Sequence, residues 1–301
     1  MAWLAWRRAL SEAGDLPAWR RAMLASSAAF EKVPALQPQE WLSFHDEHGQ
    51  SFDEYVTSVV RPTAAQRVIY IQPIDQVPTL SETCLSSLAE FTAAFFGLDV
   101  RVLPPLVIDP ASLTTRAAPD TGTPQVYTAD ILHRLLAAKP ADAFCVLGIT
   151  AQDLYPNPLV NFAFGEASAS CRVGVCSVAR YGPPFCTDSP TEHLGAMRRR
   201  CCRVIAHEIA HMAGIQHCVS YRCLMNGSAS LAESERRPLH LCPIDLRKLQ
   251  WLLRFDLTHR YRLLQQFWRN GGDHQEAAWI AGRLRASATG WGKFATLVSR
   301  G

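Results

Sequence analysis

The stretch HEIAHMAGIQHC at residues 207–218 decides the fold class. His207 and His211 are four residues apart, so on a helix they lie one turn apart on the same face. Both imidazoles can therefore reach one metal ion without a bend in the backbone. Gly214 lets the chain turn back after the helix, so His217 arrives from outside it as a third ligand.

Glu208 lies beside the histidine face, where its carboxylate can take a proton from a water on the metal. Three protein ligands leave the fourth position of a zinc ion open for that water, as in catalytic zinc sites. The ion lowers the pKa of the water toward about 7 and polarises the scissile carbonyl. The pattern of His207, Glu208 and His211 alone could occur by chance. Gly214 and His217 at the required spacing make a chance match much less common. We therefore predict a catalytic zinc on His207, His211 and His217, with Glu208 as the general base.

Three cysteines after this motif predict a second zinc site with a structural role. Cys218 and Cys223 are separated by four residues, and Cys242 stands just ahead of a predicted helix. A closed tetrahedral site needs a fourth ligand, which Asp245 can supply, although a carboxylate is harder than a thiolate. Alternatively, Asp245 only caps the helix and leaves a three-cysteine or vacant site. His240 is a less favoured substitute.

Further residues around the motif have less direct assignments. Met225, behind a three-histidine motif, is interpreted as the methionine of a Met-turn that packs beneath the histidines. His45 and His48 lack a regular ligand pattern and are interpreted as surface histidines. Surface positions are also expected for Tyr221 and Arg222, so neither is assigned to the oxyanion.

Ahead of the motif, strand-like and helix-like segments alternate, which predicts a mixed sheet with helices packed on it. Gly174 and the YGPPF sequence that follows the last strand place that strand at an edge of the sheet. The motif itself ends one long helix, with Ser189 as its N-cap and Glu192 completing a capping box. The predicted strands are 67–74, 100–108, 143–150 and 171–181, and the predicted helices are 81–96, 128–139 and 189–214.

Bulk properties exclude several classes of protein. A formal net charge of +3 over 301 residues argues against nucleic-acid binding through charge. The sequence contains no run of eighteen apolar residues, so no transmembrane helix is predicted. The N-terminus also lacks the pattern of a secretory signal. Ten cysteines without such a signal indicate reduced thiols in a cytosolic or nuclear setting.

The order and spacing of the motif residues resemble the archaemetzincin family of the metzincin clan, as do the segments RRPLHLCPID and VGVCSVARY. The resemblance covers roughly residues 60–270. It implies a mixed α/β (α+β) fold of the zincin type, a catalytic zinc, Glu208 as general base and a separate structural zinc. The family has cysteine where Asp245 stands. The residues that carry the resemblance are His207, Glu208, His211, Gly214, His217, Cys218, Cys223, Met225 and Cys242.

The expected organisation is an N-terminal helical extension (1–60), a metallopeptidase domain (61–270) and a loosely packed tail (271–301). Residues 218–270 would form a subdomain with the structural zinc. The expected protein is a monomeric zinc metallopeptidase that acts on a peptide or protein. Its substrate would pair with the free edge of strand 173–180. Two alternatives are a catalytically silent zinc-binding interaction module, which has no need of Glu208, and a zinc hydrolase of another acyl bond.

Overall fold

The computed structural model describes residues 30–34, 37–75, 77, 80–182 and 190–285. The chain divides into two compact units. The first, here called the sheet unit, comprises residues 60–214. The second, here called the cysteine unit, comprises the residues up to 59 together with those from 215 onward. Residues 30–59 of the predicted N-terminal extension therefore belong to the same unit as the cysteine-rich segment.

The sheet unit contains a five-stranded sheet in the order β2-β1-β5-β8-β7. The first four strands are parallel to one another, and β7 pairs antiparallel with β8. The sheet is therefore mixed, which confirms the predicted fold class. Its strands are β1 (Val68–Pro73), β2 (Asp99–Val102), β5 (Ala143–Thr150), β7 (Gly165–Ser168) and β8 (Val173–Ser177).

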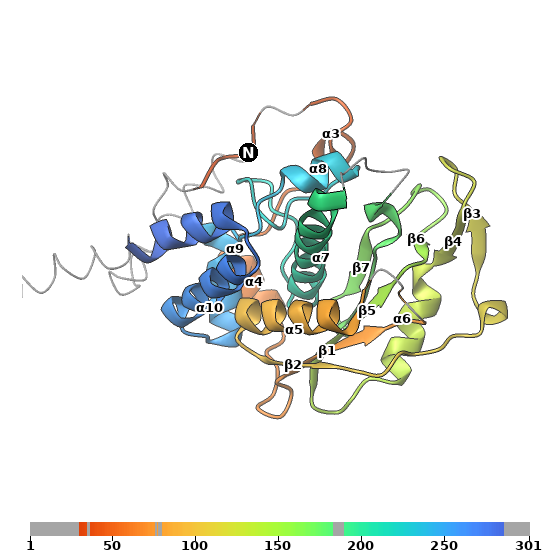
Figure 1. Ribbon diagram of the computed structural model, residues 1–301, viewed down its shortest axis with the longest axis horizontal. Coiled ribbons are helices and arrows are strands. Elements are labelled where there is room, and N and C mark those ends of the chain that lie inside the picture. The colour runs from red at the N-terminus through yellow and green to blue at the C-terminus, as the bar shows by residue number, and fades with distance from the viewer. Residues whose placement is uncertain (1–29, 35–36, 76, 78–79, 183–189, 286–301) are drawn as a thin grey trace, which may run out of the picture. The chain divides into compact units, whose positions relative to one another are not determined.

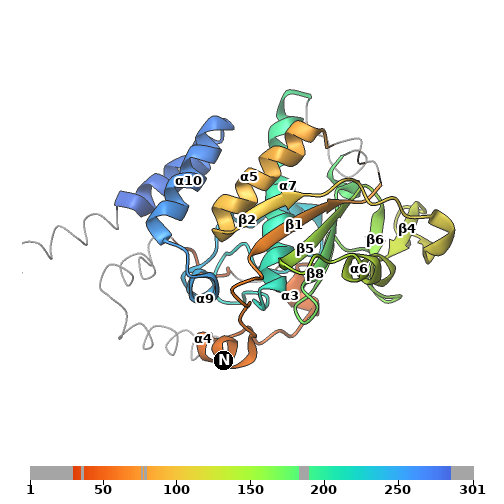
Figure 2. The same cartoon turned by 90° about the horizontal axis from the view of Figure 1, so that it is seen from below.

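Helices cover both faces of this sheet. Figures 1 and 2 show α6 (Thr128–Ala137) on the opposite side from α5 (Glu82–Phe96) and α7 (Pro190–Met212). Buried residues of β1, β5, β8 and α6 form an apolar cluster on the α6 side. A smaller sheet has the order β3-β4-β6, with β3 (Thr115–Ala117), β4 (Pro124–Tyr127) and β6 (Asp153–Tyr155).

The predicted edge position of the strand around Gly174 is wrong. β8 lies between β5 and β7, and β7 is the terminal strand. Gly174 fits an interior position because a Cβ there would lie 3.3 Å from the side chains of Ala167 and Met212, which fill the space. The segment GEAS that forms β7 lacks the β-branched residues that mark strands, so the sequence pattern missed it.

The long helix α7 carries the histidine motif and ends where the sequence predicts. Gly214 has φ +85°, and its N–H donates to the carbonyl of His211 at 2.8 Å. Positive φ costs little at glycine, so the helix stops there. The predicted capping interaction of Ser189 and Glu192 lies outside the described residues.

The cysteine unit is helical. Its α4 packs against α9, where the rings of Tyr55 and Trp251 lie 6.1 Å apart. Residues 274–285 are also helical and bury Ala277 and Ile280, so this part of the predicted loose tail is packed. Residues 1–29 and 286–301 lie outside the described range. The named helices are α3 (Trp41–Phe44), α4 (Phe52–Ser58), α8 (Leu231–Arg236), α9 (Pro243–Leu253) and α10 (Leu257–Asn270).

None of the helices in the described part of the chain has the length and apolar character needed to span a bilayer.

Candidate metal centres

The two helical histidines of the sheet unit face each other as their spacing predicts. His207 Nε2 and His211 Nε2 lie 3.0 Å apart, with His207 buried and His211 half-buried. Two ligands about 2.0–2.1 Å from a tetrahedral zinc ion are separated by about 3.3 Å. This pair therefore fits zinc, with both Nε2 atoms on one side of α7.

Glu208 lies against the first residue of the terminal strand β7. A Cβ added at Gly165 would be 2.6 Å from Glu208 Cδ, so only glycine leaves room for this carboxylate. Burial raises the pKa of the Cys176 thiol well above its ordinary value, and the Glu208 charge adds to the rise. Because Gly165 and Cys176 are cross-strand partners, Glu208 lies over the pair of strands β7 and β8.

The variant Gly165→Ala is expected to lower kcat/KM for peptide hydrolysis on the order of 10²-fold, because its methyl group displaces Glu208 from its position. Zinc content and melting temperature should stay close to those of the wild type. Gly182→Ala is the matched control, since a Cβ there meets no atom within 4 Å. Full activity in Gly165→Ala would contradict the importance of this contact.

His217 is the third residue after Gly214 and belongs to the cysteine unit. Its Nδ1 lies 2.8 Å from Glu47 Oε1. Burial alone would raise the pKa of Glu47, but His217, Trp41 and His45 together outweigh it and hold that pKa below its ordinary value. The carboxylate is therefore ionised and can only accept, so His217 Nδ1–H is the donor. Glu47 was not among the residues that the sequence singled out.

The predicted structural zinc ligands come together within the cysteine unit. One ligand atom from each of Cys218, Cys223, Cys242 and Asp245 falls in a group whose members all lie within 4.8 Å of one another. The sulfurs of Cys218 and Cys242 are 3.7 Å apart, close to the value of about 3.8 Å for two thiolates on tetrahedral zinc. All four side chains are buried. The group therefore has the size and chemistry of a closed zinc site.

Asp245 points its carboxylate at the thiols. Its Oδ2 lies 3.4 Å from Cys223 Sγ and 3.3 Å from Cys242 Sγ, near the value of about 3.6 Å for a thiolate and a carboxylate on one zinc. The N-cap of α9 is Cys242 rather than Asp245, because its Sγ accepts from the Asp245 N–H. Asp245 stands three residues after this N-cap, so the helix is capped by Cys242 and not by Asp245.

Lys248 holds the other oxygen of Asp245. Its Nζ is 2.9 Å from Oδ1, and both side chains are only 2% exposed. Burial raises the pKa values of Asp245, Cys223 and Cys242 despite the nearby Lys248, while hydrogen bonds from Cys223 and Cys242 lower that of Cys218. A divalent ion among these groups would favour their deprotonated forms.

Asn226 stabilises the loop between the first two cysteines, a role that the sequence did not reveal. Its Oδ1 accepts from the Cys223 N–H at 2.8 Å, and its Nδ2 donates to the carbonyls of Cys218 and Tyr221. Beside it, Met225 is fully buried and accepts from the Cys218 N–H through its carbonyl at 2.8 Å. The Met225 turn is therefore tied directly to the first cysteine.

The remaining sequence candidates lie elsewhere. His240 stacks on Trp279 at 3.5 Å, so it is not part of the cysteine group. Tyr221 is buried, contrary to its expected surface position, because its backbone bridges to Lys32 and draws it inward. His48 is exposed. No disulfide links the described cysteines, and Cys186 lies outside the described residues.

Comparisons with known proteins identify relatives of this chain. A family model described as peptidase family M54 matches residues 137–251. Archaemetzincin-2 of Mus musculus is 36% identical over 282 residues, which cover 84% of this chain and 79% of that protein. Archaemetzincin-1 of Homo sapiens is 36% identical over 256 residues, which cover 75% of this chain and 51% of that protein.

A solved structure has a similar fold. Archaemetzincin from Methanopyrus kandleri matches with a TM-score of 0.52 and 24% identity, over 65% of this chain and 100% of that one. The likeness extends to the complete chain of that smaller protein. The identity to the mammalian relatives, with the matching family model, shows that the chain belongs to the archaemetzincin family and is a zinc metallopeptidase.

Proposed function

We propose that His207, His211 and His217 hold the zinc ion of a peptide-bond hydrolase in which Glu208 is the general base. The observation that carries this proposal is the position of Glu208, directly after a helical ligand and with its space reserved by Gly165. The motif spacing supplies the third imidazole, since His217 follows the helical pair after Gly214. When bound, zinc supplies Lewis acidity, which polarises the scissile carbonyl and makes a water acidic enough to react near neutral pH.

Glu208 takes the proton of the attacking water and then delivers it to the leaving amine nitrogen. Glu208 is only 5% exposed, so its carboxylate is largely shielded from bulk water. Close packing against Gly165 of β7 restricts the positions that this carboxylate can take, which favours a defined orientation toward the substrate.

We infer that an extended substrate pairs with β7. This strand is the terminal strand of the sheet and begins at Gly165, next to the general base. Addition of a strand to a sheet edge uses backbone hydrogen bonds, which recognise peptides of varied sequence. The edge of strand 173–180, expected to take the substrate, is already occupied by β7.

We also propose a second, structural zinc on Cys218, Cys223, Cys242 and Asp245. The ligand separations and complete burial support this assignment. No open position for water is needed there, since four protein ligands close a tetrahedral site.

A peptide library separates a peptidase from a silent zinc-binding module. The zinc-loaded chain is incubated with the library, and new amino termini are counted with and without a metal chelator. We expect cleavage that the chelator abolishes and that added zinc restores. Binding of peptides without any cleavage would favour the silent module.

A further inference from the structure

Glu47 lies in a segment, residues 40–50, to which the sequence patterns assign no role. Its Oε1 accepts from His217 Nδ1–H at 2.8 Å and from Trp41 Nε1–H at 2.9 Å. Its Oε2 is shielded from solvent and has no hydrogen-bond partner among the described residues. A carboxylate withdrawn from water in this way is stabilised by positive charge nearby. A metal ion on the other ring nitrogen of His217 would supply such charge.

We propose that Glu47 is a positioning residue that holds His217 ready for zinc. An imidazole with its proton on Nδ1 has its only acceptor at Nε2, so the contact with Glu47 selects Nε2 as the metal ligand. A carboxylate on the far nitrogen also fixes the ring and raises the basicity of the ligand. The inference rests on the proposed function, which makes His217 the third zinc ligand.

Trp41 contacts both Glu47 and His217. Its ring meets the His217 ring edge-on, at a centroid distance of 5.4 Å and an angle of 81°. Gly227 makes room for it, because a Cβ there would lie 2.2 Å from Trp41 Cδ1. On the other face, His45 stacks on the indole at 3.7 Å. The indole is thus held in an orientation that directs its N–H at Glu47.

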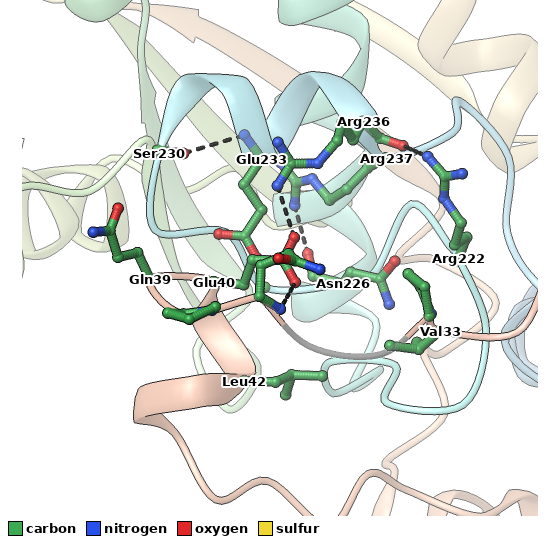
Figure 3. A pocket seen from close by; sticks show the side chains of 14 residues that line it. Val33, Gln39, Glu40, Leu42, Arg222, Asn226, Ser230, Glu233, Arg236 and Arg237 are labelled. Carbon is green, nitrogen blue, oxygen red and sulfur yellow. Dashed lines mark hydrogen bonds and ion pairs between the residues drawn. The ribbon is translucent and has the colours of Figure 1, made fainter.

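The wall of a neighbouring pocket anchors Trp41. The pocket has a volume of about 620 Å³ and is lined by residues from 33–42 and 222–237 (Figure 3). Glu233 accepts from the backbone N–H groups of Trp41 at 2.9 Å and Ala229 at 2.7 Å. Arg236 and Glu40 form an ion pair at 2.8 Å across the same wall (Figure 3). These contacts tie the start of segment 40–47 to residues 229–236.

The test compares zinc affinities of the full-length chain by competition with a chromophoric chelator. Glu47→Ala is expected to bind one of its zinc ions about 10–100-fold more weakly, since the partner of a ligating histidine is lost. Glu47→Gln, which keeps an acceptor, should recover part of that loss. Asp46→Ala is the matched control, because Asp46 is the exposed neighbour, and its affinity should be unchanged.

Two further readouts separate positioning from a general effect on the fold. The His217 Nδ1–H resonance, observed by NMR in the zinc-loaded wild type, should be lost in Glu47→Ala. Saturating zinc should return kcat of that variant toward the wild-type value. If Glu47→Ala does not fold, Trp41→Phe should show a smaller weakening in the same direction.

Wild-type zinc affinity in folded Glu47→Ala would overturn the inference. His217→Ala distinguishes this outcome from failure of the proposed ligand set. If His217→Ala loses a zinc ion and Glu47→Ala does not, only the positioning role fails. If His217→Ala keeps both ions at full affinity, the assignment of His217 itself is wrong.

Discussion

Glu208→Gln is expected to lower kcat for peptide hydrolysis by about 10²–10⁴-fold, the range that general acid–base groups contribute. The amide is nearly the same size as the carboxylate, so it fits beside Gly165, but it cannot take the proton of the attacking water. Zinc binding should persist, because the histidines that we assign as ligands are intact. The measurement is initial rate at saturating zinc, together with metal content per chain.

Glu90→Gln is the control for this variant, because Glu90 is an exposed carboxylate on α5 in the same unit. It should retain full activity and zinc. Undiminished hydrolysis by Glu208→Gln with zinc bound would contradict the role of this residue as general base. Loss of the zinc together with the activity would instead mean that Glu208 supports the metal site.

Asp245→Ala is expected to reduce the metal content from two zinc ions per chain to one. The change removes one of four buried ligands and also leaves Lys248 buried without its partner carboxylate. A buried charge that loses its partner costs about 3–5 kcal/mol, so the melting temperature should fall markedly. Metal content and thermal unfolding are measured on the same preparations.

Two companion variants separate the loss of the ligand from the loss of the ion pair. Asp245→Cys should keep two zinc ions, since thiolate is a strong zinc ligand. Lys248 still loses its partner carboxylate in this variant. Adding Lys248→Met to that variant should recover stability, because the unpaired charge is removed.

Asp53→Ala, at an exposed position of α4, is the control and should keep two ions with little change in stability. Two ions in Asp245→Ala would show that the three cysteines are sufficient. One ion in the wild type would contradict the second site altogether.

Local spacing was enough to predict contacts between residues that are only a few positions apart in the sequence. The separation of His207 and His211 dictates a shared helix face, and the 3.0 Å between their nitrogens follows from it. In the cysteine unit, the turn into α9 brings Cys242 and Asp245 together because they are three residues apart. The strand β7 was missed because its sequence has no strand pattern of its own.

By itself, the sequence determined the family, the catalytic motif and the four candidate ligands of the second site, because helix geometry and ligand chemistry act over a few residues. Only the tertiary structure decided which residues support them. Glu47 meets His217 across 170 positions of the chain, and Gly165 of β7 meets Glu208 of α7 across the intervening strand β8. Such pairs leave no periodic trace in a sequence, because each is created when distant segments pack together.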